Sequence, residues 1–185
     1  MAEKQTTKTQ YYVAASVDGF IADRENGLGW LLQFGMEEFT SDYEEFLAGV
    51  GVIVMGSRTY EWLLAEGSAW AYPDHVAWVL TSRELPAFPG GGDIRFATGD
   101  VSALHAEWVR VAAGRNVWIV GGGEVAAQVA DAGLLDELLL TTMPVVLGAG
   151  APLLPVARLS TDLAASNTVV HPGGAVSTRY AISRG

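Results

Sequence analysis

The sequence predicts an α/β domain in three layers, with a mostly parallel central sheet, helices on both of its faces and an antiparallel C-terminal hairpin. Three observations support this fold class. Apolar residues alternate along the chain between strand-like runs and helical spacing. Several strand-like runs end at glycine and lead directly into a helix-like segment, which is typical of parallel strands connected by helices. The last two runs flank the turn sequence Pro172-Gly173-Gly174.

Each element follows from these patterns. Strands are expected over residues 11–17, 50–55, 75–80, 94–97, 116–120, 138–144, 168–171 and 176–182. Helices are expected over residues 37–48, 57–65 and 124–132. In a further helix, which Asp100 can cap, Leu104, Trp108 and Val111 share one face. Ser57 can cap the helix that starts there, and Gly67 follows the end of that helix.

Composition and charge exclude several classes of function. The chain has 185 residues, no cysteine and three histidines far apart in sequence, so neither disulfides nor a metal site is expected. The formal net charge of −10 argues against binding to nucleic acid. The sequence contains two lysines, Lys4 and Lys8. The rest of the chain must therefore bind anions through arginine.

The first ten residues are polar and are predicted to be a disordered tail that precedes a single domain over residues 11–185. Apolar runs stay shorter than the roughly 18 to 20 residues that span a bilayer, and residues 1–10 lack the apolar core of a signal peptide. We therefore expect a cytoplasmic protein without a membrane segment.

A glycine-rich turn is the first candidate site. The strand over residues 116–120 runs into Gly121, Gly122 and Gly123, and Glu124 and Val125 open the next helix. Glycines let a phosphate approach the backbone, and a helix N-terminus offers free N–H groups. The segment alone leaves a phosphate-binding turn and an ordinary tight turn equally open. A Rossmann protein would carry such glycines after its first strand, and here they come late.

Two further strand ends carry polar residues. Gly56, Ser57, Arg58 and Thr59 lie between a strand and a helix, and their N–H and hydroxyl groups could bind phosphate beside the Arg58 charge. Thr81, Ser82 and Arg83 follow the next strand and suit a lone phosphate, such as the 2′-phosphate that distinguishes NADPH from NADH. Taken singly, each pattern is better explained as an ordinary N-cap or a polar strand exit.

The first strand offers a different kind of site. Ala14 and Ala15 are small, so a flat group could lie close to this strand. Asp18 and Gly19 follow it, and from composition Asp18 is best explained as a residue that caps the turn.

Five segments in order resemble the dihydrofolate-reductase-like superfamily: Ser-Val-Asp-Gly-Phe-Ile-Ala, Met-Gly-Ser-Arg-Thr-Tyr, Leu-Thr-Ser-Arg, Trp-Ile-Val-Gly-Gly-Gly, and Gly-Leu-Leu-Asp-Glu-Leu followed by Pro-Val-Val-Leu-Gly-Ala-Gly. The likeness is closer to the bacterial branch that includes the C-terminal reductase domain of the riboflavin-biosynthesis deaminase-reductase. The resemblance implies a dihydrofolate-reductase-like fold, NADPH as cofactor and a homodimer. An apolar stretch over residues 134–147 is a candidate dimer interface.

The resemblance also implies roles for individual residues. Ala14 and Ala15 would back the nicotinamide, with Ile21 near its ring. Residues 56–59 and 121–125 would bind the cofactor's phosphates, and residues 81–83 its 2′-phosphate. Asp18 would lie on the substrate side and is the candidate catalytic residue. Trp30, Phe34 and Phe39 could line the substrate pocket, or equally could be core or lid residues.

The chain departs from dihydrofolate reductases at the first helix. Trp30 follows Gly29 where those enzymes have proline, and the acid expected five residues later is Gly35. We therefore predict a reductase that transfers hydride from NADPH, bound across the carboxyl ends of the strands, to a C=N or C=O of a small pterin-, pyrimidine- or sugar-like substrate. The alternatives are a non-catalytic nucleotide-binding dimeric scaffold and an ordinary Rossmann dehydrogenase, which strand order would distinguish.

Overall fold

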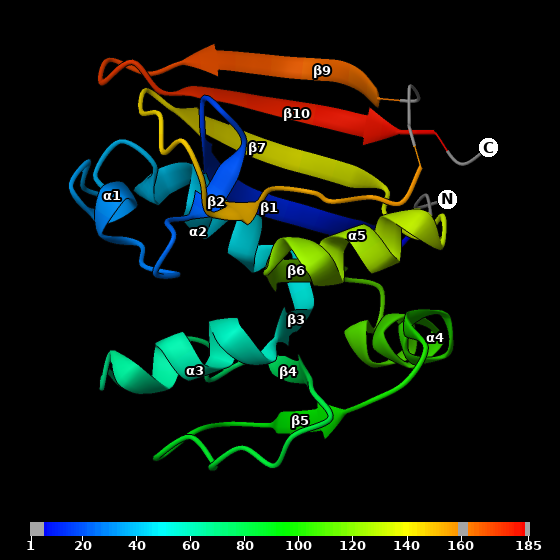
Figure 1. Ribbon diagram of the computed structural model, residues 1–185. Coiled ribbons are helices and arrows are strands. Elements are labelled where there is room, and N and C mark those ends of the chain that lie inside the picture. Colours follow the sequence, from blue (N-terminus) through cyan, green and yellow to red (C-terminus); the bar gives the residue numbers. More distant parts are fainter. Residues whose placement is uncertain (1–5, 159–162, 184–185) are drawn as a thin grey trace.

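The computed structural model describes residues 6–158 and 163–183, and it is built around one large sheet (Figure 1). The strands of this sheet are β1 (Thr9–Ser16), β3 (Val50–Gly56), β4 (Val76–Leu80), β5 (Ile94–Ala97), β6 (Asn116–Gly121), β7 (Glu137–Met143), β9 (Leu163–Val170) and β10 (Val176–Ile182). A small second sheet pairs β2 (Phe20–Ala22) with β8 (Ala151–Pro152). The helices are α1 (Gly29–Leu32), α2 (Thr40–Ala48), α3 (Ser57–Ala65), α4 (Val101–Ala112) and α5 (Gly123–Asp131).

The strand order in the large sheet is β5-β4-β3-β6-β1-β7-β10-β9. Strands β5 to β7 in this order pair in parallel, whereas β10 runs antiparallel to both β7 and β9. The predicted mostly parallel sheet with an antiparallel C-terminal hairpin is therefore confirmed. The first strand lies between β6 and β7, and the glycine turn follows β6. This order differs from that of a Rossmann dehydrogenase and rules that alternative out.

Helices cover the sheet on both faces, as predicted. On one face Val52 and Val54 of β3 pack with Trp108 of α4 and Val129 of α5. On the other face Ile53 and Met55 pack with Tyr60 of α3 and with apolar side chains of α2. Alternate residues of one strand thus face opposite layers, because successive side chains of a strand point to opposite sides. None of the helices in the described parts of the chain is long and apolar enough to cross a membrane.

Several boundaries differ from the predicted ones for local reasons. Helix α2 begins at Thr40 rather than at residue 37, because residues 36–39 form turns. Gly56 is the N-cap of α3, and Ser57 is its first residue and makes no capping hydrogen bond. The predicted cap at Asp100 is confirmed, since its carboxylate accepts a hydrogen bond from the Ser102 N–H.

The predicted disordered tail is too long at its C-terminal end. Strand β1 already begins at Thr9, and Gln10 is buried. The Nζ atom of Lys8 lies 2.6 Å from Oε1 of Glu137, and the Gln10 side chain donates to Oε2 of the same carboxylate. Buried polar partners, rather than apolar residues, thus extend the strand. Residues 1–5 lie outside the described part of the chain.

The predicted dimer interface over residues 134–147 is partly buried within the sheet. Strand β7 lies between β1 and β10, and Leu135, Leu138 and Met143 are buried. Much of the apolar run therefore belongs to a strand covered on both faces, whereas Val146, which follows β7, is 69% exposed. Exposed side chains also occupy β9, where all eight residues from Leu163 to Val170 are exposed at the edge of the sheet.

Candidate functional site

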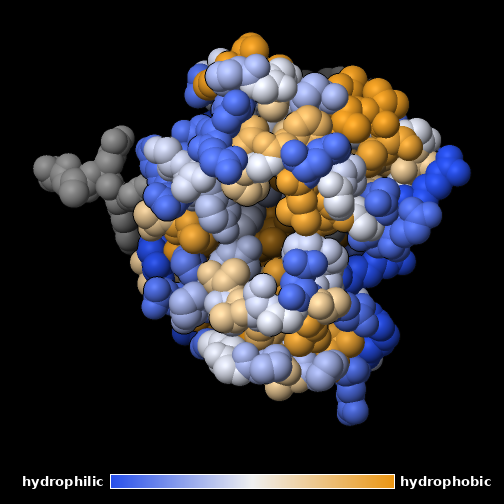
Figure 2. Space-filling view, turned by 90° about the vertical axis from the view of Figure 1, so that its left-hand side faces the viewer, coloured by the Kyte–Doolittle hydropathy of each residue, from blue (hydrophilic) through white to orange (hydrophobic). Residues whose placement is uncertain are grey.

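A cleft of about 1260 Å³ opens at the carboxyl ends of β4, β3 and β6, which are neighbours in the sheet. The segments that follow these three strands all line it. In the space-filling view the molecule is hollowed between its upper and lower parts, with apolar side chains at the floor (Figure 2). Strand order thus brings together three turns that are far apart in sequence.

Fourteen residues predicted to bind the cofactor line this cleft: Ala14, Ile21, Gly56, Ser57, Arg58, Thr59, Thr81, Ser82, Arg83, Gly121, Gly122, Gly123, Glu124 and Val125. Ala15 does not line it. Its side chain is 1% exposed, whereas the three residues of β1 that precede it, Tyr12, Val13 and Ala14, all line the cleft.

Two helices begin at the cleft without a side-chain cap. Gly56 and Gly122 are the N-caps of α3 and α5, each nine residues long, and neither makes a side-chain capping hydrogen bond. The first N–H groups of both helices therefore remain available to an anionic ligand. The peptide bond between Gly121 and Gly122 is cis.

Two of the three glycines of the turn at residues 121–123 are closely packed. A Cβ atom on Gly121 would lie 3.0 Å from the Thr59 hydroxyl oxygen, so the two phosphate-type turns touch. A Cβ on Gly123 would collide with the carbonyl oxygen of Pro152. A Cβ on Gly122 would meet no atom within 4 Å, so this position faces open space.

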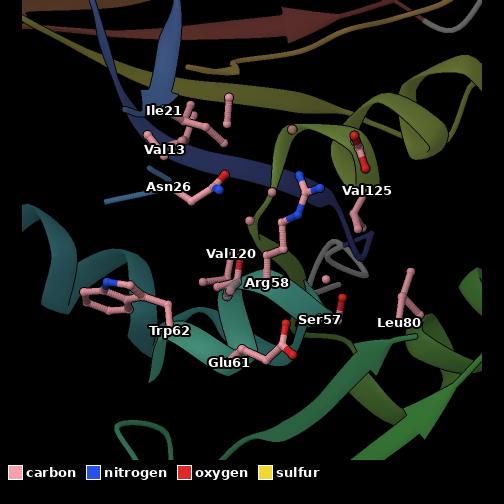
Figure 3. Close-up of a pocket in the computed structure, with 18 of the residues that line it drawn as sticks. Val13, Ile21, Asn26, Ser57, Arg58, Glu61, Trp62, Leu80, Val120 and Val125 are labelled. Atoms are coloured by element: carbon pink, nitrogen blue, oxygen red, sulfur yellow. The ribbon is translucent and has the colours of Figure 1, made fainter. Parts of the chain in front are cut away.

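Positive charge in the cleft comes from arginine, as the composition required. Arg58 extends from the start of α3 into the cavity (Figure 3). Arg83 lies after β4, and its backbone N–H donates a hydrogen bond to the hydroxyl oxygen of Thr81 at 3.0 Å. A third arginine, Arg24, lines the cleft from the loop after β2. Together these groups suit a ligand that carries several phosphates.

Glu61 faces the same part of the cleft and forms a two-pronged ion pair with Arg83. The two guanidinium nitrogens lie 2.8 and 2.7 Å from its two carboxylate oxygens. The hydrogen bonds from Arg83, together with the charges of Arg83 and Arg58, lower the pKa of Glu61. The carboxylate therefore stays ionised at neutral pH and partly neutralises the cleft.

The other end of the cleft is more apolar. Val13 and Ile21 lie beside Asn26 at one end of the cavity, whereas Leu80 lies at the opposite end (Figure 3). Leu28, Leu31, Trp62 and Leu63 also line the cleft. The loop before α1 is closed by Asp23, whose Oδ1 accepts hydrogen bonds from the N–H groups of Glu25 and Gly27.

The structure does not support a catalytic Asp18. Its carboxylate accepts hydrogen bonds from the N–H groups of Leu147 at 3.0 Å and Gly148 at 2.6 Å, and it is not among the residues that line the cleft. Hydrogen bonds from the Ser16 hydroxyl and from these backbone groups lower the pKa of Asp18. Asp18 thus joins the end of β1 to the segment after β7, and it is a poor proton donor.

The aromatic residues predicted to line the substrate pocket pack elsewhere. Trp30, Phe34 and Phe39 belong to a small apolar cluster around Met143 and Ala175, and Phe39 packs on the His171 ring at 4.7 Å. None of the three lines the cleft. In the short helix α1 it is Leu31, next to Trp30, that lines the cleft, and the three aromatic side chains pack in an apolar cluster outside it.

Sequence reasoning missed several residues that line the cleft: Tyr12, Val13, Asp23, Arg24, Asn26, Leu28, Leu31, Glu61, Trp62, Leu63, Tyr72 and Gln128. Of these, Glu61 could have been found from the sequence, because it lies three residues after Arg58 on the same predicted helix and therefore on the same helix face.

Comparison with known proteins agrees with this fold. The family model described as the RibD C-terminal domain matches residues 108–170. A Bacillus subtilis (strain 168) protein, the uncharacterized protein YwjB, is 32% identical over 146 residues, which cover 79% of this chain and 82% of that protein.

Solved structures show the same fold. A putative riboflavin biosynthesis protein from Shewanella sp. PV-4 superposes with a TM-score of 0.84 at 23% identity, over 96% of this chain and 100% of that one. Dihydrofolate reductase from Enterococcus faecalis superposes with a TM-score of 0.67 at 16% identity, over 97% and 98%. The protein therefore has a dihydrofolate-reductase-like fold. Within that class, the chain belongs to the RibD C-terminal domain family.

Proposed function

We propose that this protein is an NADPH-dependent reductase that transfers hydride to a C=N or C=O of a small pterin-, pyrimidine- or sugar-like substrate. One observation carries the proposal. The three turns at residues 56–59, 81–83 and 121–125 follow neighbouring strands and line one cleft together with Ala14 and Ile21. The similar structure from Enterococcus faecalis is a complex with NADP(H), which supports a dinucleotide as the ligand of such a cleft.

The residues of the cleft fit such a cofactor. A pyrophosphate needs close backbone approach and free N–H groups, and the starts of α3 and α5 offer both. Gly122 lines the cleft, and a Cβ atom there would meet no protein atom within 4 Å, so a bulkier residue would extend into the space that the cofactor needs. Arg58 and Arg83 supply positive charge in a protein of net charge −10. When bound, the nicotinamide would supply the hydride.

The protein's own residues would hold and shield the reacting groups. Ala14 leaves room for a flat ring against β1, and Ile21 would lie beside that ring. Leu28 and Leu31 would exclude water from the substrate side, which strengthens polar interactions there. Asn26 lies among these apolar groups and would orient a polar edge of the substrate (Figure 3). Orientation and exclusion of water are the protein's contribution in this proposal.

The alternative proposal is a non-catalytic nucleotide-binding scaffold, and one observation favours it. Among the described residues that line the cleft, the carboxylates are Asp23, Glu61 and Glu124. The first is used to close its own loop and the second is paired with Arg83. The third, Glu124, lies in the first turn of α5, next to the glycine turn. None of these three carboxylates is thus left to donate a proton at the apolar end.

Binding and turnover separate the two proposals. The purified protein would be titrated with NADPH and then mixed with pterins, aminopyrimidines and small carbonyl compounds, while oxidation of NADPH is followed by absorbance. A substrate that consumes NADPH at a rate dependent on its concentration supports the reductase. Tight NADPH binding with no consumption in any mixture favours the scaffold.

We also propose a homodimer, in which β9 pairs with a second copy of the chain. Strand β9 is an edge strand with eight exposed residues, five of them alanine, valine or leucine and none of them charged. Such an edge can add a strand from another chain. Thr168→Lys on this edge should lower the molar mass measured in solution, and a monomeric wild-type protein would refute the dimer.

A further inference from the structure

We propose that Glu61 sets how strongly the cleft prefers NADPH over NADH, by holding the guanidinium of Arg83 that a 2′-phosphate would bind. This inference rests on the proposed function, since it concerns the cofactor of that same site.

Glu61 holds Arg83 in the geometry of a bidentate ion pair. Glu61 and Arg83 both line the cleft, and they meet through two parallel N–H···O bonds of 2.8 and 2.7 Å. This is the fork by which an arginine binds a phosphate. A 2′-phosphate placed against residues 81–83 would therefore compete with the Glu61 carboxylate for the same two donors.

The negative charge of Glu61 disfavours a phosphate at this position. Glu61 stands one helical turn after Arg58, and the charges of both arginines act on its carboxylate. A 2′-phosphate would bring further negative charge next to this carboxylate, which costs free energy. A 2′-hydroxyl brings none, and it can donate a hydrogen bond to a carboxylate. An acidic residue on the ribose 2′-hydroxyl is the arrangement that selects NAD in other dinucleotide sites.

The ion pair between Arg83 and Glu61 is exposed, so a ligand can separate it. The side chains of Arg83 and Glu61 are 55% and 40% exposed. An ion pair this exposed contributes little to stability, so its rearrangement by a ligand costs little. Glu61 thus lowers the preference for the 2′-phosphate without abolishing it.

A second ion pair provides a matched control. Glu107 and Arg110 of α4 also meet through two N–H···O bonds, and Glu107 is exposed to a similar extent as Glu61. Neither of them lines the cleft. Glu107→Gln therefore removes one negative charge from the protein without touching the proposed site.

The test compares Glu61→Gln with Glu107→Gln and with the wild type. Dissociation constants would be measured by calorimetry for NADPH, NADH, adenosine 2′,5′-bisphosphate and adenosine 5′-monophosphate. We expect Glu61→Gln to tighten NADPH and the 2′,5′-bisphosphate about two- to fivefold, the range for releasing an exposed pair. Binding of NADH and the 5′-monophosphate should stay unchanged or weaken, and Glu107→Gln should match the wild type.

The variant Arg83→Ala tests whether Glu61 acts through the Arg83 guanidinium. In that background Glu61→Gln should tighten NADPH less, because it relieves only the charge repulsion with the 2′-phosphate and has no guanidinium to release. An effect of unchanged size would overturn the role of Arg83. An equal change for NADPH and NADH in Glu61→Gln, or an equal gain in Glu107→Gln, would overturn the specificity role while leaving the proposed function standing. Failure of the wild type to bind either dinucleotide would overturn both.

Discussion

Gly123 begins α5 directly against the backbone of Pro152 in β8, so closely that a Cβ atom would collide with the Pro152 carbonyl oxygen. This contact ties the glycine turn to the short second sheet, whose other strand, β2, carries Ile21. The two sides of the cleft are therefore joined through a glycine.

The neighbouring glycines should respond differently to alanine. Gly123→Ala should destabilise the protein by about 1–3 kcal/mol, because backbone atoms of β8 cannot move away cheaply. Gly122→Ala should unfold at nearly the wild-type temperature but bind NADPH more weakly, since its methyl group would enter the open cleft. Thermal unfolding and nucleotide titration of both variants check this. Equal stability of the two variants would contradict the packing argument.

Removal of the Arg83 guanidinium should affect one dinucleotide selectively. Arg83→Ala should weaken NADPH binding about tenfold, the scale of a lost hydrogen bond to a charged group, and leave NADH binding nearly unchanged. Arg110→Ala, which removes an exposed arginine of α4 outside the cleft, is the control. A parallel loss for NADPH and NADH in Arg83→Ala would refute the assignment of the 2′-phosphate to residues 81–83.

Asp18 should matter for stability rather than for chemistry. Its folded-state pKa is lowered, so its contribution is fully present above the unfolded pKa and is lost as pH falls through the folded pKa. Asp18→Asn should therefore lower the midpoint of thermal unfolding at neutral pH and show a smaller difference from the wild type in acid. Turnover of any identified substrate should persist, and its complete loss in a folded variant would restore the catalytic role.

The buried carboxylate of Glu137 should make the fold sensitive to acid. Burial on its own raises the pKa of Glu137, but hydrogen bonds from Lys8 and Gln10 and the charges of Lys8 and Arg179 outweigh this effect and lower the pKa. Lys8→Met should cost about 1–3 kcal/mol of unfolding free energy at neutral pH, measured in urea.

The same variant has a defined pH dependence. The ion pair stabilises the fold above the unfolded pKa of Glu137, and this contribution disappears as pH falls through the folded pKa. The difference between Lys8→Met and the wild type should therefore shrink in acid, and Lys8→Arg should behave like the wild type. A difference that is constant from neutral to acidic pH would show that the ion pair does not carry the effect.

The sequence predicted most strands, because β-branched runs bounded by glycine are local signals. It missed β2 and β8, because three- and two-residue strands depend on a partner about 130 residues away. Strand β9 was predicted from residue 168, whereas it is already present at Leu163, and residues 159–162 lie outside the described part of the chain. Its exposed alanines and polar residues have no strand pattern of their own.

In the candidate site, too, local features could be predicted from the sequence and features that depend on distant partners could not. The glycine turn at residues 121–123 could be predicted from the sequence, because three successive glycines between a strand-like run and a helix-like segment are a local signal. The orientation of Trp30 could not, since it depends on which side of a four-residue helix meets Met143. Glu61 was missed because its ion pair with Arg83 requires knowing that β4 lies beside β3 and its following helix.

The most direct test of the account is a titration of the wild-type protein with NADPH and, separately, NADH, following the midpoint of thermal unfolding. A ligand that binds only the folded state adds roughly 2.7 kcal/mol of stability at a hundredfold excess over its Kd. The account predicts stabilisation by NADPH at lower concentration than by NADH. An unchanged midpoint with both nucleotides at millimolar concentration would contradict a dinucleotide site at the ends of β3, β4 and β6.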